Sequence, residues 1–346
     1  MKLFIALATN NSLKYLPLSL EAIFDQSIRN FEVIVVDNAS LDGTGDFIHQ
    51  NYPEATVLRN YNNRGAAHAK NQALKIVRNK IAAEGVNFDD AYVLVIDPSV
   101  ILPKDFVRCL DTALKSNDEG GSFAFKVLRL GSKDFDEPIS DFNSAVLDSA
   151  GIAVSGAGKV RRMGQGERDA GQFENTKEIF GPDPLIALYR FSALEDAALD
   201  GDCFDADFFG GGEDLDLIWR LRLLGWKSYF LSTPHVFRFG GSPESDKKIW
   251  SRVKNYHRKI RSYRLVRNHF WILLKNQQFA NMVIFFPLFF LREAVKFFHS
   301  LILRQKNLKA YLSAFLGTPK MLKKRFAIYK KNHLTAGEMR RIFKLK

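Results

Sequence analysis

Residues 32–50 read EVIVVDNASLDGTGDFIHQ: a short apolar run, a polar turn and a segment with helical spacing. The run Glu32–Val36 favours a strand and Thr44–Gln50 favours a helix. The same alternation extends along the chain to both sides. The expected strands are Leu3–Ala8, Glu32–Val36, Thr56–Leu58 and Tyr92–Ile96, and the expected helices are Leu13–Phe24, Thr44–Gln50 and Ala66–Ile81. Strands that alternate with helices at this spacing predict an α/β fold with a parallel sheet.

Small polar residues follow each of these four strands. The segments are Thr9-Asn10-Asn11, Asp37–Thr44, Asn60–Gly65 and Asp97-Pro98-Ser99. Such residues also form turns and helix caps, but that explanation accounts less well for four successive polar strand ends. Because ligands of parallel α/β sheets bind at the carboxyl ends of the strands, we expect a nucleotide base and ribose to bind here. The sequence has neither a dinucleotide fingerprint after the first strand nor a P-loop.

A second motif, residues 208–226, reads FFGGGEDLDLIWRLRLLGW. Three glycines precede Glu213, Asp214 and Asp216, and these acids fall in the first turn of an expected helix, whose dipole stabilises negative charge. Asp216 and Arg220 have the spacing of an ion pair on one helix face. Compensation of the acids is the favoured role of Arg220 and Arg222, and contact with phosphate oxygens stays open as the alternative.

The polar strand ends and the acidic motif of residues 208–226 together resemble family 2 glycosyltransferases, in particular the rhamnosyltransferase-like branch. The resemblance implies a GT-A type fold, with a Rossmann-like, mostly parallel sheet flanked by helices. It also implies an inverting transfer of a sugar, rhamnose among the candidates, from a nucleoside-diphosphate sugar to a hydroxyl of a lipid-linked or cell-surface polysaccharide acceptor. Asp214 then matches the general base, with Glu213 as the second candidate or, alternatively, a residue that binds the acceptor. The expected donor-binding residues are Thr9, Asn10, Asp37, Asn38, Asn63, Arg64, Gly65, Asp97, Ser99 and Arg238, and the expected acceptor-side or supporting residues are Asp216, Arg220, Arg222 and Trp226.

The metal-binding positions depart from the family pattern. Ser99 stands where the pattern has a second acid after Asp97, and Arg238 stands where relatives carry a histidine, with His235 displaced by three positions. One interpretation is that Asp97 alone holds a divalent metal, Mg or Mn, weakly and through water. Another is that Arg238 neutralises the donor pyrophosphate and the metal requirement is weakened or lost. A third is a catalytically lapsed member that acts as a sugar-binding or assembly partner at the membrane.

The charge divides the chain into two parts. Residues 1–242, the expected glycosyltransferase domain, carry a net charge of −9, whereas residues 243–346 carry +21. The second part is expected to be basic, mainly helical and membrane-associated. Cys109 and Cys203 allow no disulfide framework and indicate a reducing compartment, and the N-terminus does not read as a signal peptide.

Two segments of the basic part favour a membrane surface. Ser251–Asn276 predicts a basic amphipathic helix, which alternatively packs on the acidic domain. Phe279–Leu291 is apolar but too short to span a bilayer. Pro287 is expected to break the helix, so that the segment forms a kinked, interfacial or re-entrant hairpin. A second basic cluster suited to anionic membrane lipids comprises Lys320, Lys323, Lys324, Arg325, Lys330 and Lys331. We expect a peripheral or monotopic protein on the cytoplasmic face of the membrane, and no nucleic-acid partner, because nucleic acid does not require so long an apolar run.

Overall fold

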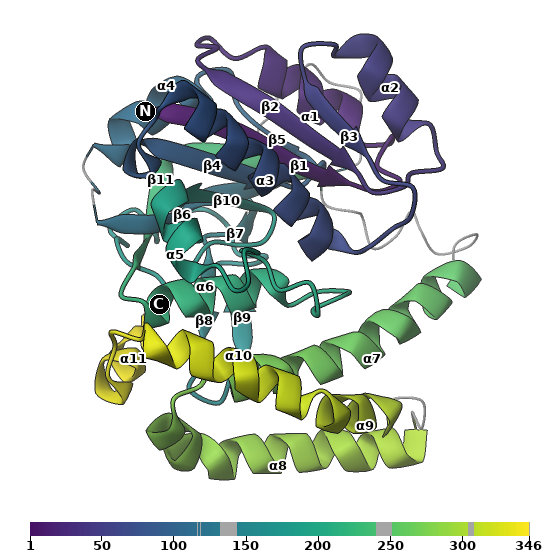
Figure 1. The fold of residues 1–346 in the computed structure, drawn as a ribbon, viewed down its shortest axis with the longest axis vertical. Helices are drawn as coiled ribbons and strands as arrows, with labels where there is room; N and C mark the ends of the chain where they lie inside the picture. Colours follow the sequence, from purple (N-terminus) through teal and green to yellow (C-terminus); the bar gives the residue numbers. More distant parts are fainter. Residues whose placement is uncertain (116, 118, 132–143, 240–250, 304–307, 346) are drawn as a thin grey trace.

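The computed structural model describes residues 1–115, 117, 119–131, 144–239, 251–303 and 308–345 of the 346-residue chain. A large sheet runs through the molecule in the order β3-β2-β1-β4-β10-β6-β11-β5, with β7 beside β6 (Figure 1). Its strands are β1 (Lys2–Thr9), β2 (Phe31–Asp37), β3 (Thr56–Arg59), β4 (Ala91–Ile96), β5 (Val100–Ile101), β6 (Gly120–Leu130), β7 (Leu147–Ser149), β10 (Ile186–Arg190) and β11 (Lys227–Phe239). A separate hairpin pairs β8 (Ile152–Val154) with β9 (Val160–Arg162).

The four expected strands form the parallel half of this sheet. β2 and β4 flank β1 in parallel, and β3 adds to β2, so their carboxyl ends share one edge. The sheet as a whole is mixed. β6 and β11 pair in parallel, but β10 runs antiparallel between β4 and β6, and β5 and β7 are also antiparallel to their neighbours. A parallel neighbour needs a crossover connection that is usually helical, whereas an irregular segment leads from β9 into β10.

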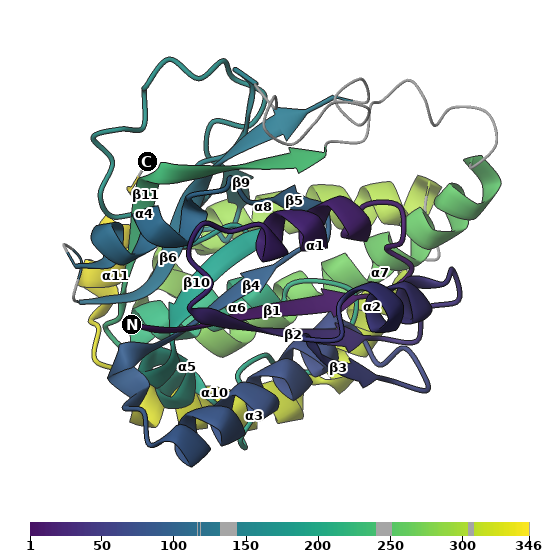
Figure 2. The same cartoon turned by 90° about the horizontal axis from the view of Figure 1, so that it is seen from above.

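Helices cover both faces of the sheet (Figure 2). On one face, α1 (Leu16–Phe24), α2 (Thr44–Asn51) and α4 (Phe106–Leu114) share an apolar core with the odd-numbered residues of β1, such as Ile5. On the other face, α3 (Ala66–Glu84), α5 (Phe191–Ala197) and α6 (Glu213–Leu223) pack against the alternate residues, such as Phe4. Successive side chains of a strand point to opposite faces, so strands covered on both sides are apolar throughout.

The C-terminal part is a layer of helices beneath α6 (Figure 1). It comprises α7 (Ser251–Asn276), α8 (Phe279–Leu303), α9 (Leu308–Leu316), α10 (Thr318–Lys330) and α11 (Ala336–Ile342). The expected mainly helical C-terminal region is therefore present, while the expected boundary at residue 242 lies outside the described residues. The expected break at Pro287 is wrong, because α8 is one helix that contains this proline. No helix in the described parts of the chain combines the length and apolarity that crossing a bilayer requires.

Candidate active site

Asp37 ends β2 at the carboxyl edge of the parallel strands, and its side chain is buried. Its Oδ1 accepts hydrogen bonds from the backbone N–H and the hydroxyl of Ser40. Its Oδ2 lies 3.5 Å from Arg59 Nε and accepts no hydrogen bond within the described structure. A side chain on Gly45 would place a Cβ 2.7 Å from Oδ2, so only glycine leaves room for the carboxylate in this position. Asp37 thus has one oxygen held by its own turn and one that is buried beside Arg59 without a hydrogen bond.

Asn38 joins the segments that follow β2 and β3. Its Nδ2 donates to Asn63 Oδ1 (3.0 Å) and to the carbonyl of Gly65 (3.2 Å). Its Oδ1 accepts from Asn60 Nδ2 (3.1 Å) and from the backbone N–H of Arg64 (3.3 Å). These four bonds satisfy both ends of the amide and hold the 60–65 loop in place.

The end of β1 completes this edge. Asn10 Nδ2 donates to the carbonyl of Asn38 (2.8 Å), and Thr9 pairs with Asp37 in the sheet register. The Thr9 hydroxyl is buried and forms no hydrogen bond to any described residue. A buried polar group without a partner is costly, so Thr9 Oγ1 and Asp37 Oδ2 are the donor-site atoms best placed to receive a ligand.

The loop before α3 contacts the segment that leads into the acidic motif. Gly65 has φ +91°, and a Cβ there would lie 2.8 Å from the Phe209 ring, so only glycine allows the contact. Farther along α3, Asn71 exchanges two hydrogen bonds with the backbone of Phe204. The residues before the motif therefore pack along the first turns of α3.

Lys70 of α3 holds the two acids that begin α6. Its Nζ lies 2.6 Å from Asp214 Oδ1 and 3.4 Å from Glu213 Oε1. Both carboxylates are buried, and Glu213 Oε2 receives no hydrogen bond from the described part of the chain. Burial by itself lowers the pKa of Lys70, but the two carboxylates outweigh it and raise this pKa above its ordinary value. Burial raises the pKa of Glu213 despite the attraction of Lys70.

The sequence did not identify Lys70. One signal was available. Lys70 lies four residues after Ala66, in the first turns of a helix that begins just after a strand end, where ligands bind. The partner acid lies 144 positions away in the sequence, so only the fold joins them.

Asp97, Ser99 and Arg238 meet where β4 gives way to β5. Asp97 Oδ1 accepts from the backbone N–H and hydroxyl of Ser99, and Arg238 Nε donates to Ser99 Oγ (3.3 Å). Arg238 Nη1 also donates to Asp148 Oδ2 (2.8 Å). The sequence did not identify Asp148, which comes from the short strand β7, outside both recognised motifs.

Three arginine side chains lie close to Asp148. Besides Arg238, it pairs with Arg129 (2.6 Å), and Arg162 lies 3.7 Å away. Although burial opposes it, the hydrogen bonds from Arg129 and Arg238 lower the pKa of Asp148 below its usual value. The three guanidinium groups are only partly buried, and Arg162 is also paired with the buried Asp183 (2.7 Å).

These residues offer a metal ion few protein ligands. Divalent cations such as Mg²⁺ and Mn²⁺ prefer several oxygen ligands, carboxylates above all. One oxygen of Asp97, Oδ1, is engaged with Ser99, and the neighbouring Arg238 carries positive charge. In the part of the chain that the structure describes, no three or more His, Cys, Asp or Glu side chains gather in a way that could hold a metal.

The remaining motif residues support α6. Asp216 is fully buried and pairs with Arg220 Nε (3.0 Å), and Arg220 also donates to the carbonyls of Ala197 and Cys203. Arg222 donates to Glu178 and to the carbonyl of Trp226. Trp226 Nε1 donates to Asp196 (3.1 Å). Charge compensation, the favoured interpretation of both arginines, agrees with these contacts.

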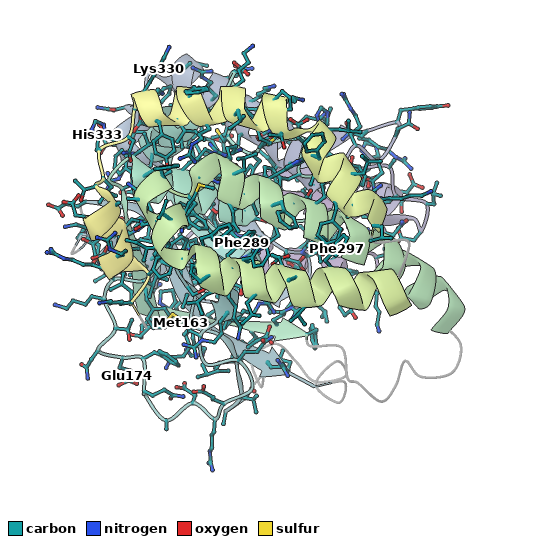
Figure 3. The ribbon with its side chains drawn as sticks, turned by 90° about the horizontal axis from the view of Figure 1, so that it is seen from below. Met163, Glu174, Phe289, Phe297, Lys330 and His333 are labelled. Atoms are coloured by element: carbon teal, nitrogen blue, oxygen red, sulfur yellow. The ribbon has the colours of Figure 1, made fainter. Side chains whose placement is uncertain are left out.

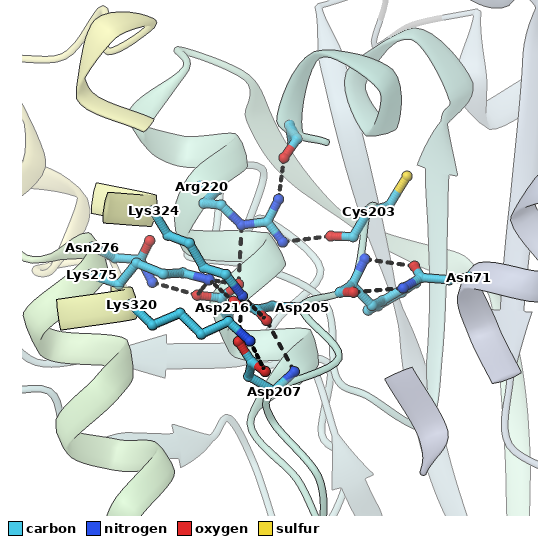
Figure 4. Close-up of polar contacts among 12 residues, drawn as sticks. Asn71, Cys203, Asp205, Asp207, Asp216, Arg220, Lys275, Asn276, Lys320 and Lys324 are labelled. Carbon is cyan, nitrogen blue, oxygen red and sulfur yellow. Dashed lines mark hydrogen bonds and ion pairs between the residues drawn. The ribbon is translucent and has the colours of Figure 1, made fainter. Parts of the chain in front are cut away.

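Asp216 also anchors the C-terminal helices (Figure 4). Lys275 of α7 lies 2.8 Å from Asp216 and 2.6 Å from Asp205, and Lys324 of α10 lies 2.5 Å from Asp205. Lys320 and Lys324 also pair with Asp207. The alternative in which the basic part packs on the acidic domain is therefore observed, and both of these members of the expected lipid-binding cluster form ion pairs within the chain.

The sheet order and the acids at the start of α6 define a GT-A type glycosyltransferase fold. The chain belongs to the family described as Glycosyl transferase family 2, whose model matches residues 4–197. The acidic residues 213–214 lie beyond that matched range.

Similar proteins agree with this assignment. Glycosyltransferase GlyG of Streptococcus pneumoniae serotype 4 is 28% identical over 112 residues, which are 31% of this chain and 33% of GlyG, so the match spans about a third of that relative. The fold is similar to residues 1–349 of S. aureus TarS in complex with UDP-GlcNAc, with a TM-score of 0.52, 16% identity and coverage of 99% of this chain and 90% of that one. A longer TarS structure has a TM-score of 0.51 and 19% identity, with 95% and 50% covered.

Proposed function

We propose that this family 2 glycosyltransferase transfers a sugar from a nucleoside-diphosphate sugar to a hydroxyl of a lipid-linked or cell-surface polysaccharide acceptor. The transfer inverts the configuration at the anomeric carbon. The observation that carries the proposal is the 2.6 Å contact between Lys70 and Asp214. It supports a carboxylate at a defined position beside the edge that carries Asp37. Inverting transfer needs such a carboxylate to deprotonate the acceptor hydroxyl during its attack on the anomeric carbon.

In this proposal, each part of the site has one task. Asp37 and Thr9 bind the base and ribose, while the 60–65 loop closes the donor pocket. Arg238 faces the diphosphate and stabilises its charge as the leaving group departs. Asp214 takes the proton of the acceptor hydroxyl, and Lys70 keeps the carboxylate oriented.

The donor is a uridine- or deoxythymidine-diphosphate sugar. The resemblance to the rhamnosyl branch favours rhamnose, whereas TarS was solved with UDP-GlcNAc. A panel that contains both donors, with GDP-mannose as a third, decides between them when nucleoside diphosphate release is measured with a membrane lipid extract as acceptor.

Asp214→Asn tests the assignment of the base. We expect turnover to be abolished while calorimetric donor binding stays nearly unchanged, because the amide keeps the shape but cannot take the proton. Glu213→Gln is the matched control in the same turn, and it should retain measurable turnover. Persistent turnover in Asp214→Asn would exclude Asp214 as the base, and lack of binding of every donor by the unmodified protein would favour a lapsed enzyme.

We also propose that the protein associates peripherally with the cytoplasmic face of a membrane. The net charge of +21 in residues 243–346 and the exposed apolar residues of α8 support this. Co-sedimentation with phosphatidylglycerol vesicles tests it. Binding that survives a high-salt wash indicates apolar insertion, whereas binding lost in salt indicates purely electrostatic attraction to phosphate.

A further inference from the structure

The polarity of α8 is the reverse of that of a helix facing water. Its polar residues Asn281 and Glu293 are buried, with Asn281 Nδ2 donating to the carbonyl of Ala336 (3.1 Å). Its outward residues are apolar and each is more than half exposed: Val283, Ile284, Phe286, Leu288, Phe290 and Leu291. Figure 3 shows α8 crossing the front of this face. So large an exposed apolar patch marks an interaction surface.

Behind this face lies a cavity of about 390 Å³ between α7, α8 and α9. That volume lies within the range of about 300–1,000 Å³ typical of sites for small molecules. Aromatic and aliphatic side chains dominate the lining, among them Phe270, Leu274, Phe285 and Phe289. The amide of Gln277 is one of its few polar groups. Its Nε2 donates to the carbonyl of Gly156 (2.7 Å), while its Oε1 is buried and accepts no hydrogen bond from the described residues.

The cavity is open toward the exposed face. Phe286 and Phe315 line it, yet these side chains are 55% and 74% exposed. The mouth of the cavity is therefore continuous with the apolar surface of α8, and a hydrocarbon chain can enter from that surface without crossing a polar rim. An apolar cavity of this kind does not hold water well, whereas it suits an apolar ligand.

The surroundings favour a lipid over a protein partner. Protein interfaces have a polar rim and roughly one hydrogen bond per 100–200 Å². In contrast, residues 283–291 read VIFFPLFFL and supply no polar side chain. The positive net charge of the C-terminal part complements anionic headgroups.

We propose that the cavity between α7, α8 and α9 takes up one hydrocarbon chain of a bilayer lipid. This inference rests on the proposed membrane association. Helix α7 lies between the bound hydrocarbon and the acidic motif. Its Trp271 lines the cavity and packs against Phe208. Its Asn268 Nδ2 donates to the carbonyl of Gly211 (2.6 Å). Lipid uptake thus takes place against the helix that supports the loop before Glu213 and Asp214.

Trp271 provides the readout, because bromine atoms quench indole fluorescence on close contact. The full-length protein is mixed with phosphatidylglycerol vesicles whose acyl chains carry bromine, and separately with a monomeric brominated fatty alcohol. Vesicle co-sedimentation is measured in parallel. We expect vesicle binding, loss of emission with both probes, and saturation with the alcohol. Trp271→Phe should remove the quenched component.

A matched pair of variants separates the cavity from the surface. Ala157→Phe places a ring in the cavity, whereas Ala280→Phe adds the same ring at an exposed position of α8. We expect Ala157→Phe to lose quenching by the alcohol and Ala280→Phe to retain it. Circular dichroism confirms that both variants are folded.

The outcomes distinguish the two proposals. Vesicle binding without quenching of Trp271 would overturn chain uptake and leave membrane association intact. Saturable quenching by the alcohol without vesicle binding would show that the cavity takes an apolar ligand, but it would overturn both membrane association and uptake of a chain from a bilayer. Formation of a dimer in sedimentation that buries α8 and blocks the alcohol would overturn uptake in favour of a second copy of the chain.

Discussion

Lys70 Nζ lies 2.6 Å from Asp214 Oδ1 and 3.4 Å from Glu213 Oε1, so one buried ammonium serves two adjacent carboxylates. The relationship joins α3, which starts at the carboxyl edge of the sheet, to α6, which starts with the acidic motif. The cation lets two acids lie side by side in a buried first turn, at a defined distance from the strand ends.

Replacing Lys70 with methionine should lower turnover and change its pH dependence. Burial already raises the pKa of Glu213, and Lys70 opposes this. Without the cation, Asp214 and Glu213 both lose the positive charge that favours their ionised forms. We therefore expect the acid limb of the kcat/KM profile, which the proposed base Asp214 sets, to move to higher pH. A pH–rate series on the variant measures the shift.

Lys70→Arg is the control for this prediction, because it retains the charge and should keep the profile close to that of the unmodified protein. Stability provides a second readout. A raised carboxyl pKa stabilises the fold below the unfolded value of about 4.3 and loses that contribution as the pH rises through the folded pKa. Lys70→Met should therefore lose stability more steeply above pH 4.3. Identical profiles for Met and Arg would refute the role of the charge.

Asp37→Asn should weaken donor binding by about tenfold or more, because a hydrogen bond to a charged group contributes roughly 1.5–3 kcal/mol. The atom concerned is Oδ2, which is buried and accepts no hydrogen bond within the described structure. Calorimetric titration with the nucleoside diphosphate alone measures the loss. Asp46→Asn is the control, since Asp46 is exposed and its side chain pairs with Arg59, the same arginine that approaches Asp37. Equal effects of both substitutions would assign the loss to Arg59.

Ser99→Asp should make donor binding dependent on a divalent metal. The substitution restores a second carboxylate beside Asp97 and gives Arg238 a new acidic neighbour in place of the Ser99 hydroxyl. We expect the unmodified protein to bind donor equally with and without a chelator, and the variant to need Mn²⁺ or Mg²⁺. If the chelator abolishes donor binding by the unmodified protein, Arg238 does not replace the metal.

The sequence located the parallel half of the fold because its signals are local. The strand at Glu32–Val36 and the helix that starts at Thr44 carry their own periodicity, and the structure reproduces them as β2 and α2. The direction of β10 depends on where the chain enters the sheet after an irregular segment, and no residue within Ile186–Arg190 specifies it.

The residues of the candidate site also differ in whether a local sequence signal identifies them. Asp37 and Asp214 stand in recognisable motifs, whereas Lys70 and Asp148 are ordinary residues whose partners are distant in the sequence. Pro287 shows the limit of a local rule, because a proline costs a helix one hydrogen bond, yet α8 is packed against α9 and α11 and continues through it.

Lys275→Met should detach or destabilise the C-terminal helices. Lys275 is fully buried between Asp205 and Asp216, so its removal leaves two buried carboxylates with less compensation. Breaking a buried pair in this way costs about 3–5 kcal/mol. Lys320→Met removes a lysine that is 62% exposed and pairs with Asp207, and it should cost about 0–1 kcal/mol. Urea denaturation of the full chain, followed by circular dichroism, compares the two.

Acid should have the same effect as the Lys275 substitution. Although burial favours the protonated form, Lys275 and Lys324 outweigh it and hold the pKa of Asp205 far below its usual value. A lowered carboxyl pKa gives stability that is present above the unfolded value of about 3.9 and is lost as the pH falls through the folded pKa. Urea denaturation should therefore give a lower free energy of unfolding at pH 3 than at pH 7. Because the pair is buried, high salt at pH 7 should change this free energy little, and a strong salt effect would show that the contact is solvent-screened.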